Sequence, residues 1–270
     1  MSKPILIFDS GLGGLTIYQA LQQAMPGLAY HYLADSARLP YGLLTEQALT
    51  EGCVALIETY VKQAQVQLVV IACNTASTAI LDVLRNRLSI PIVGVVPAIK
   101  PAAELSASGC IALLATTATI QRPYTDELIE KFASHCHVQK IACPELVHMA
   151  EEKYRYGYAD TIQLQQLLGA VDPLVDTLVL GCTHFPILHA EIAACFSKKM
   201  RIVDSREAIV RRVRSLVDSQ TEHPVSVYTD TSAVDSALFE KLVTKGFTKI
   251  TSSFEAAPQE QYEMGSFKAV

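Results

Sequence analysis

Two cysteines in the sequence are followed by side chains that form hydrogen bonds. The two stretches are I-A-C-N-T-A-S at 71–77 and L-G-C-T-H-F-P at 180–186. A single cysteine is most often a small, inert hydrophobe in a protein core. Cys73 and Cys182, however, each end an apolar run and precede polar groups. The polar residues that follow them are Asn74, Thr75, Thr183 and His184. Because a thiolate accepts a proton and a thiol donates one, these positions suit acid/base chemistry on a small molecule.

A third candidate site is the turn Asp9-Ser10-Gly11-Leu12-Gly13-Gly14, which follows the apolar run 4–9. It departs from both nucleotide-binding loops, because Thr16 stands where G-x-G-x-x-G needs glycine and no Gly-Lys-Ser/Thr follows. Free backbone N–H groups at a helix start, with the Ser10 hydroxyl, can instead hold a carboxylate. Asp9 can orient a thiol or an ammonium group, or cap the next helix. A tight turn that only requires glycine is the alternative for the whole stretch.

Short apolar runs alternate with segments of helical periodicity along the chain. The predicted strands are 4–9, 28–35, 67–73, 91–96, 110–116, 138–143, 177–182 and 201–205, and the clearest helices are 45–64, 76–88, 123–134, 160–169 and 205–218. This alternation is typical of mainly parallel sheets that helices cover on both faces. The predicted fold class is therefore α/β.

Several of the polar positions are predicted to share one edge of this architecture. In parallel α/β sheets, ligands bind beyond the carboxyl ends of the strands. Asp9, Cys73, Thr116 and Cys182 all stand at predicted strand ends, so we expect the functional site there. Pro40-Tyr41-Gly42 follows a possible strand end and is either an ordinary turn or a loop that lines the ligand.

Two similar α/β lobes are expected, with the active site in the cleft between them. Two prolines in V-V-P-A-I-K-P-A-A at 95–103 follow a strand and restart the chain. Asp9 and Cys73 in the first half are spaced almost as Thr116 and Cys182 are in the second. The predicted domains are a first lobe of residues 1–97 plus 207–252, a second lobe of 98–206, and a flexible tail at 253–270.

The composition excludes several classes of protein. The 270 residues carry a net charge of −5, and 50% are hydrophobic. Without long blocks of like charge, a broad affinity for nucleic acid or anionic membranes is not expected. No apolar run reaches the roughly 18 residues of a membrane span, and no signal-peptide pattern precedes the first strand. Seven widely spaced cysteines, an odd number, indicate reduced thiols in a cytoplasmic protein. Since Cys136 and Cys143 lack C-x-x-C spacing, no metal site is expected.

Five separated motifs occur in order along the chain. They are Asp9-Ser10-Gly11-x-Gly13-Gly14, Pro40-Tyr41-Gly42, Cys73-Asn74-Thr75-Ala76, Gly181-Cys182-Thr183-His184 and Val203-Asp204-Ser205. Together they closely resemble the bacterial glutamate racemases of the aspartate/glutamate racemase family, and the stretch 95–103 is similar to the enterobacterial type in Gram-negative bacteria. The resemblance implies a cofactor-independent racemase that interconverts L- and D-glutamate and supplies the D-isomer for peptidoglycan.

The resemblance also implies a role for individual residues. Cys73 and Cys182 would be the two acid/base groups, because inversion at a weakly acidic α-carbon needs a base on one face and an acid on the other. Asp9 would accompany Cys73, and His184 would accompany Cys182 as a proton shuttle. Glu151 would be a further catalytic carboxylate of the second lobe. The implied substrate contacts are Asp9, Ser10, Tyr41, Gly42, Asn74, Thr75, Thr116, Thr119, Thr183 and His184.

Two places depart from the family pattern. Glu145 and His148 precede Glu151 where apolar or proline residues are more usual, and Glu152 follows it directly. The role given to Glu151 could therefore belong to Glu152. Thr116 lacks the glycine that often stands before the corresponding threonine, which weakens its assignment as a substrate contact.

Alternative functions stay open at this stage. The nearest is a two-cysteine racemase for aspartate or a hydantoin, although His184 after Cys182-Thr183 favours glutamate. A non-catalytic binding protein on the same fold, such as an inhibitor of DNA gyrase, would not require both thiols. No lysine with a phosphate-binding loop indicates pyridoxal phosphate, and neither a flavin nor a nicotinamide is indicated. The resemblance adds two partners to consider: the activator UDP-N-acetylmuramoyl-alanine, and a second copy of the chain in a homodimer.

Overall fold

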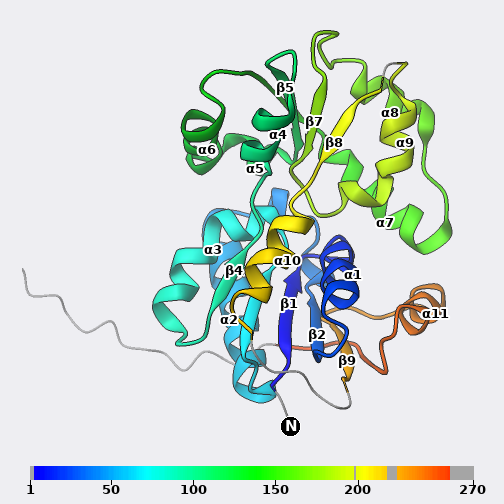
Figure 1. Cartoon of the computed structure of the whole chain (residues 1–270). Helices are drawn as coiled ribbons and strands as arrows, with labels where there is room; N and C mark the ends of the chain where they lie inside the picture. Colours follow the sequence, from blue (N-terminus) through cyan, green and yellow to red (C-terminus); the bar gives the residue numbers. More distant parts are fainter. Residues whose placement is uncertain (1–2, 198, 218–223, 256–270) are drawn as a thin grey trace, which may run out of the picture.

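Two lobes make up the protein, each built around one β-sheet (Figure 1). The computed structural model describes residues 3–197, 199–217 and 224–255. All strand pairs in the two sheets are parallel. The prediction of an α/β fold with two mainly parallel sheets is therefore confirmed.

The first lobe contains a six-stranded sheet with β1 in its interior. Its order is β10 (Lys249–Thr251), β9 (Ser226–Asp230), β2 (Tyr30–Ala34), β1 (Ile5–Asp9), β3 (Leu68–Ile71) and β4 (Ile92–Gly94). Ile5 and Ile7 of β1 belong to the hydrophobic core on one face, and Leu6 and Phe8 belong to the core on the other. Since both faces are covered, β1 is a continuous apolar run.

The second lobe contains a four-stranded sheet of the same kind. Its order is β6 (His137–Ala142), β5 (Cys110–Ala115), β7 (Thr177–Leu180) and β8 (Arg201–Val203). Ala112 and Leu114 of β5 face one core, while Ile111 and Leu113 face the other. The interior strands of both sheets are thus held by apolar contacts on two sides, which gives the residues at their ends a fixed base.

Helices cover both faces of each sheet (Figure 1). On the first sheet, α1 (Leu15–Ala24), α10 (Arg206–Arg214) and α11 (Ser236–Thr244) cover one face, and α2 (Glu46–Ala64) and α3 (Asn74–Arg87) cover the other. On the second, α7 (Glu145–Tyr156), α8 (Thr161–Leu168) and α9 (His189–Ala194) lie opposite α4 (Ile99–Leu105), α5 (Thr117–Gln121) and α6 (Pro123–Ala133). The 3-10 turns are η1 (Ser36–Arg38), η2 (Tyr41–Leu43) and η3 (Phe185–Leu188).

Some elements differ from the sequence prediction. β3 ends at Ile71 and α3 already begins at Asn74, so Cys73 caps the helix rather than ending the strand. The helix expected after the glycine-rich turn is α1, at 15–24. The prediction named no element at 99–105, 117–121, 145–156, 189–194, 226–230, 236–244 or 249–251, where the structure has α4, α5, α7, α9, β9, α11 and β10. The strands β9 and β10 end in polar residues. β9 is held by pairing with the distant β2, and β10 by pairing with β9, and local sequence pattern does not reveal such pairing.

The chain crosses between the lobes twice, after β4 and after β8. The Ser205 hydroxyl donates to the Val96 carbonyl at 2.5 Å and ties the two crossing segments together. The first sheet contains strands from before and after the second sheet in the sequence. The exact domain bounds at 97/98 and 206/207 stay a prediction.

At the start of the predicted tail, the Phe254 N–H donates to the Asp230 carbonyl at 2.9 Å. The Phe254 ring packs edge-on against Tyr60, with 5.4 Å between the ring centroids. The remainder of that prediction, 256–270, lies outside the described residues. Within the described ranges, no helix has the length and apolar character needed to cross a membrane.

Candidate active site

The carboxyl ends of β1, β3 and β7 bring together the predicted catalytic residues. β1 and β3 are paired neighbours, so Asp9 and the Cys73 turn lie side by side in the first lobe. Cys182 follows β7, which is paired to β5 in the interior of the second sheet. Asp9 is fully buried, and Cys73 and Cys182 are 6% and 7% exposed. The two thiols lie close enough for the charge of Cys182 to act on Cys73.

The Cys73 thiol lies at the start of α3 beside Asp9 and Ser10. Burial raises the pKa of Cys73 well above its ordinary range, and the charge of Asp9 adds to this rise. Hydrogen bonds from the Ala76 N–H and the Ser10 hydroxyl oppose the rise by stabilising the thiolate. Burial also raises the pKa of Asp9, although the charge of His184 and hydrogen bonds to the carboxylate act against it. Cys73 and Asp9 thus form a buried pair in which a proton on either group relieves the other.

Cys182 has a different partner, the imidazole of His184. The Cys182 Sγ and His184 Nδ1 atoms lie 3.9 Å apart, and His184 Nε2 lies 2.8 Å from Glu151 Oε1. Burial disfavours the charged imidazole, but hydrogen bonds to Cys182 and Glu151 raise the pKa of His184 well above its ordinary value. Burial tends to raise the pKa of Glu151, yet the hydrogen bond and the charge of His184 hold this pKa below its usual value. His184 and Glu151 therefore form a buried imidazolium–carboxylate pair next to the thiol.

His184 Nε2 has a partner in either protonation state. When the ring carries both protons, Nε2 donates to Glu151 at 2.8 Å. When Nε2 has no proton, its lone pair can accept from the Gly13 N–H at 3.2 Å. The ring can therefore gain or lose a proton without losing all hydrogen bonds at Nε2, as a proton shuttle requires.

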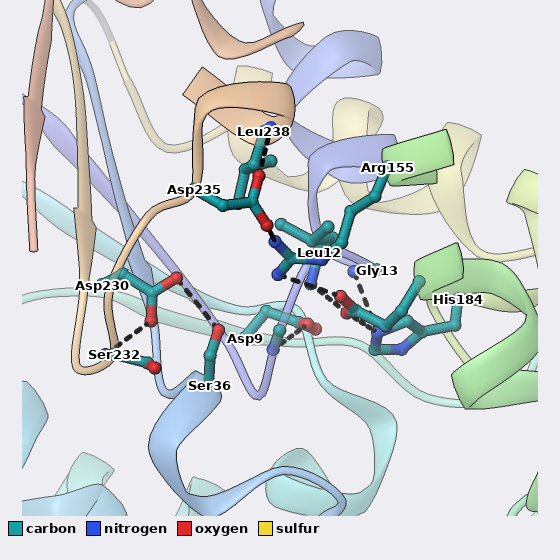
Figure 2. A network of polar contacts seen from close by, with 12 residues as sticks. Asp9, Leu12, Gly13, Ser36, Arg155, His184, Asp230, Ser232, Asp235 and Leu238 are labelled. Carbon is teal, nitrogen blue, oxygen red and sulfur yellow. Dashed lines mark hydrogen bonds and ion pairs between the residues drawn. The ribbon is translucent and has the colours of Figure 1, made fainter. Parts of the chain in front are cut away.

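The backbone N–H groups of the glycine-rich turn in the first lobe already contact side chains of the protein itself. Its N–H contacts are Gly11 to Asp9 Oδ1 at 2.9 Å, Leu12 to Glu151 Oε1 at 2.8 Å and Gly13 to His184 Nε2 at 3.2 Å. Figure 2 shows Leu12 and Gly13 of the first lobe pointing at the second-lobe side chains. The turn does bind a carboxylate, as the sequence indicated, but in this structure that carboxylate belongs to Glu151.

Glycine is required in this turn because the other lobe approaches so closely. A Cβ atom on Gly13 would lie 2.5 Å from His184 Nδ1 and 2.7 Å from the His184 backbone nitrogen. A Cβ atom on Gly11 would lie 2.5 Å from Glu151 Oε1. Glycine at positions 11 and 13 therefore leaves the space that Glu151 and His184 of the other lobe occupy.

Threonines make further polar contacts between the lobes. The Thr183 hydroxyl donates to Asp9 Oδ2 at 3.0 Å. The Thr75 hydroxyl lies 3.1 Å from that of Thr116 and 3.3 Å from that of Thr119. All four threonines are buried. The sequence-predicted Thr116 and Thr119 thus meet the Cys73 side of the site, where a ligand could replace the contacts between hydroxyls.

Asn74, a predicted substrate contact, has a buried hydrogen-bond donor without a partner. Among buried side-chain polar atoms in the described part of the chain, Asn74 Nδ2 and the Tyr154 hydroxyl have no hydrogen-bond partner. An unpaired buried donor is costly, so a ligand acceptor at Asn74 would be stabilising. The cavity lined by Thr16, Asn74, Cys182 and Thr183 measures about 10 Å³, roughly the space of one water. This cavity reaches Cys182 but not Cys73, and it is too small for an amino acid.

The loop that contains Tyr41 and Gly42 is held by its own polar cluster. The Tyr41 hydroxyl donates to Asp35 Oδ2 at 2.6 Å, and Arg38 forms an ion pair with the same carboxylate. The Arg38 guanidinium also lies over the Tyr41 ring, 5.6 Å from its centroid. Because the Tyr41 phenol is committed to Asp35, a substrate contact from this turn would come from the backbone of Tyr41 or Gly42.

This cluster yields a prediction at Gly52. A Cβ atom there would lie 1.6 Å from Arg38 Nη1, so alanine should push the guanidinium away from Asp35. The displaced group is the far end of a flexible side chain, and alanine suits the interior of α2 better than glycine by about 1 kcal/mol. We therefore expect these effects to offset each other, so that Gly52→Ala changes the free energy of unfolding by less than about 1 kcal/mol. Urea denaturation of single and double variants would measure it. In an Arg38→Ala background, where the clash is absent, the same change should stabilise the protein by about 1 kcal/mol; an equal effect in both backgrounds would contradict the predicted clash.

The structure adds residues that the sequence interpretation did not name. Arg155 contacts Glu151 within the second lobe, and its Nη1 lies 2.8 Å from Asp235 Oδ2 of the first lobe. Figure 2 shows this chain of contacts from Asp235 to His184. The four-residue spacing of Glu151 and Arg155 was a usable signal, since such pairs lie on one helix face. No local signal links Arg155 to Asp235, which is 80 residues away.

Sequence comparisons agree with this geometry. The sequence model described as Asp/Glu/hydantoin racemase matches residues 5–213. A curated glutamate racemase of Shewanella sp. (strain MR-7) is 49% identical over 243 residues, which cover 89% of this chain and 89% of the relative. A glutamate racemase of Shewanella sp. (strain ANA-3) is 52% identical over 218 residues, which cover 80% of each chain.

Solved structures share this arrangement over more than nine-tenths of the chain. Escherichia coli glutamate racemase, crystallised with L-glutamate and the activator UDP-MurNAc-Ala, superposes with a TM-score of 0.87 at 36% identity. The match covers 93% of this chain and 98% of that one. A glutamate racemase isoform of Bacillus anthracis gives a TM-score of 0.81 at 28% identity, with 94% of this chain and 97% of that one covered.

Proposed function

Because the chain belongs to the Asp/Glu/hydantoin racemase family, we propose that it interconverts L- and D-glutamate with Cys73 and Cys182 as its two acid/base residues. The observation that carries this proposal is the pair of buried thiols from different lobes, each with its own ionisable partner. Asp9 serves Cys73, and His184 serves Cys182. Glutamate is favoured over aspartate or a hydantoin because the similar proteins described above are glutamate racemases.

The chemistry follows from having one thiol on each face of the α-carbon. One cysteine, as thiolate, removes the α-proton, and the other, as thiol, donates a proton to the opposite face. The resulting carbon has the inverted configuration, and the two cysteines have exchanged protonation states. For the reverse direction the roles are swapped. Asp9 and His184, with Glu151, are proposed to reset these states by accepting or supplying protons.

The substrate contacts are proposed from the groups around the thiols. The buried Asn74 amide and the hydroxyls of Ser10, Thr75 and Thr183 would hold the carboxylates, with Thr116 and Thr119 joining Thr75 from the second lobe. Asp9 would bind the ammonium group through its negative charge. The backbone of Tyr41 and Gly42 would close the site from the η2 turn. Support comes from the unpaired Asn74 Nδ2 and from the burial of all these hydroxyls.

Deuterium exchange from solvent tests the proposal directly. In D₂O, without an added cofactor, we expect the α-position of both L- and D-glutamate to gain deuterium, because each thiol protonates one face with a solvent-derived proton. Proton NMR of each enantiomer measures the exchange, and circular dichroism measures the racemisation. Exchange with aspartate should be much slower. An enzyme that exchanged neither glutamate enantiomer would not have the proposed function.

The proposal also covers an activator, a homodimer and the place of action in the cell. The structurally similar E. coli enzyme was crystallised with UDP-MurNAc-Ala as an activator, and we propose that this chain responds to the same compound. A homodimer and a role in supplying D-glutamate for peptidoglycan follow from the family resemblance. The described cysteines are all free thiols, which fits the reducing cytoplasm as the site of action. A secondary interaction with DNA gyrase stays a prediction without structural support.

A further inference from the structure

Arg155 lies at the junction of the two lobes and the catalytic carboxylate. It belongs to α7, one helical turn after Glu151, and its side chain is 19% exposed. Its Nη2 atom lies 3.6 Å from Glu151 Oε2, and its Nη1 atom lies 2.8 Å from Asp235 Oδ2. One guanidinium therefore bridges a carboxylate of its own lobe and a carboxylate of the other, as its planar array of donors permits.

The two oxygens of Glu151 have separate tasks. Oε1 accepts the Leu12 N–H at 2.8 Å and contacts His184 Nε2 at 2.8 Å. Oε2 faces Arg155 instead. The guanidinium attracts Oε2 and so helps to keep Oε1 against the imidazole, together with the Leu12 N–H. Its positive charge also helps to hold the pKa of Glu151 down, and a charged Glu151 stabilises the imidazolium of His184.

Because Asp235 belongs to the first lobe, the bridge through Arg155 depends on the distance between the two lobes. This residue precedes α11 in the first lobe, and its Oδ1 atom caps that helix by accepting the Leu238 N–H at 2.7 Å. Its Oδ2 atom accepts from Arg155. Lys241 of α11 also donates to the Tyr154 carbonyl on α7. Figure 2 shows the Asp235 and Arg155 side chains meeting next to the His184 site. Separation of α7 from α11 would remove one of the two partners of Arg155.

We propose that Arg155 is a positioning residue for the half of the reaction that uses Cys182, holding Glu151 against His184 while Asp235 keeps the lobes together. The inference rests on the proposed function, since it assumes that each thiol works on one face of glutamate. It assigns Arg155 no contact with substrate. Its effect is transmitted through Glu151 and His184, which serve Cys182, whereas Cys73 is served by Asp9.

A one-sided reaction can isolate each thiol. In glutamate analogues with chloride on the β-carbon, a single base removes the α-proton while chloride leaves with the bonding electrons of its carbon. The proton passes to the thiolate and an enamine results, without any need for the second thiol. The Cys182→Ser and Cys73→Ser variants first identify which enantiomer of the analogue depends on which thiol. Ordinary racemisation cannot make this distinction, because kcat/KM must fall equally in both directions when the equilibrium constant is one.

We expect Arg155→Met to slow elimination about tenfold for the enantiomer that depends on Cys182 and to change the other by less than about twofold. Arg155→Lys should recover part of the loss, since lysine keeps the charge but not the two-sided bridge. Asp235→Asn should give a smaller loss on the same side, because asparagine still caps α11. Arg85→Met is the matched control, as Arg85 pairs with Asp82 on an exposed part of α3.

The possible results separate the inference from the proposed function. Equal losses for both enantiomers, a loss only on the Cys73 side, or no loss in Arg155→Met would each overturn the positioning role. In all three cases, wild-type exchange of deuterium into both glutamates would still uphold racemisation. A wild-type enzyme without such exchange would overturn the proposed function itself, whatever the Arg155 variants showed.

Discussion

Replacing either Cys73 or Cys182 by serine should lower the rate of glutamate racemisation by about a thousandfold or more. A positioned acid/base group commonly contributes about 10²–10⁴ to a rate, and a serine hydroxyl is a far weaker acid than a thiol. The burial that raises the pKa of Cys73 would disfavour a serine alkoxide even more. Circular dichroism of the reaction mixture, started from L-glutamate and separately from D-glutamate, measures the loss.

The two single variants should also differ from each other in a one-sided reaction. Each should retain elimination from one enantiomer of a β-chloro analogue, because the remaining thiol still serves its own face. Cys136→Ser is a suitable control, since Cys136 is a half-buried free thiol in the turn between α6 and β6, away from the carboxyl ends of the strands. If Cys73→Ser or Cys182→Ser racemised glutamate at the wild-type rate, the assignment of two bases would be wrong.

Gly13→Ala should cost the enzyme about a hundredfold in kcat, although residue 13 carries no reactive group. The added methyl would lie 2.5 Å from His184 Nδ1, 2.7 Å from the His184 backbone nitrogen and 2.7 Å from the Thr183 hydroxyl. Because one of these neighbours is backbone, the second lobe must shift away from the turn. A displacement near 1 Å at a catalytic group can lower a rate by about 10²-fold, and here it would move His184 and Cys182 together away from the turn and from the Cys73 side of the site.

Gly169→Ala provides the matched control for this variant. Residue 169 ends α8 with helical dihedral angles, and a Cβ atom there would meet only ordinary contacts at 3.4 Å. Its kcat should stay within about twofold of the wild type. Thermal unfolding of both variants separates a local shift from loss of the fold. A Gly13→Ala enzyme with normal kcat would show that the turn does not seat His184 during catalysis.

Much of the fold could be predicted from the sequence because it depends on local pattern. The apolar runs at 4–9 and 110–116 are strands because helices cover both faces of each sheet. The helix at 45–64 has a side-chain cap at Thr45 and a clear period. By contrast, β9 depends on pairing with β2, which lies nearly 200 residues away in sequence, and β10 in turn pairs with β9. Local reading does not show such pairing.

The candidate site also has one part that the sequence predicted and one part that depends on long-range contacts. Cys73, Cys182, Asp9 and His184 were named from their positions at strand ends and from the family resemblance, and the structure brings them together. Glu151 was the weakest of the named catalytic residues, yet it is buried 2.8 Å from His184, whereas Glu152 is exposed. The bridge from Glu151 through Arg155 to Asp235 depends on how one lobe meets the other, which motif spacing does not specify.

The carboxylate of Glu151 occupies the Leu12 N–H. This is a second place, beside Asn74 and the hydroxyls, where a carboxylate of the substrate could bind. Glutamate carries carboxylates too, and the N–H groups that could bind one already have partners when the lobes are together. A substrate carboxylate could reach these N–H groups only in molecules whose lobes are apart. If such molecules made up about 1% of the total, the apparent dissociation constant would be about 100-fold above the intrinsic one. Any ligand that favours the separated form at another site would raise the affinity for glutamate without touching it.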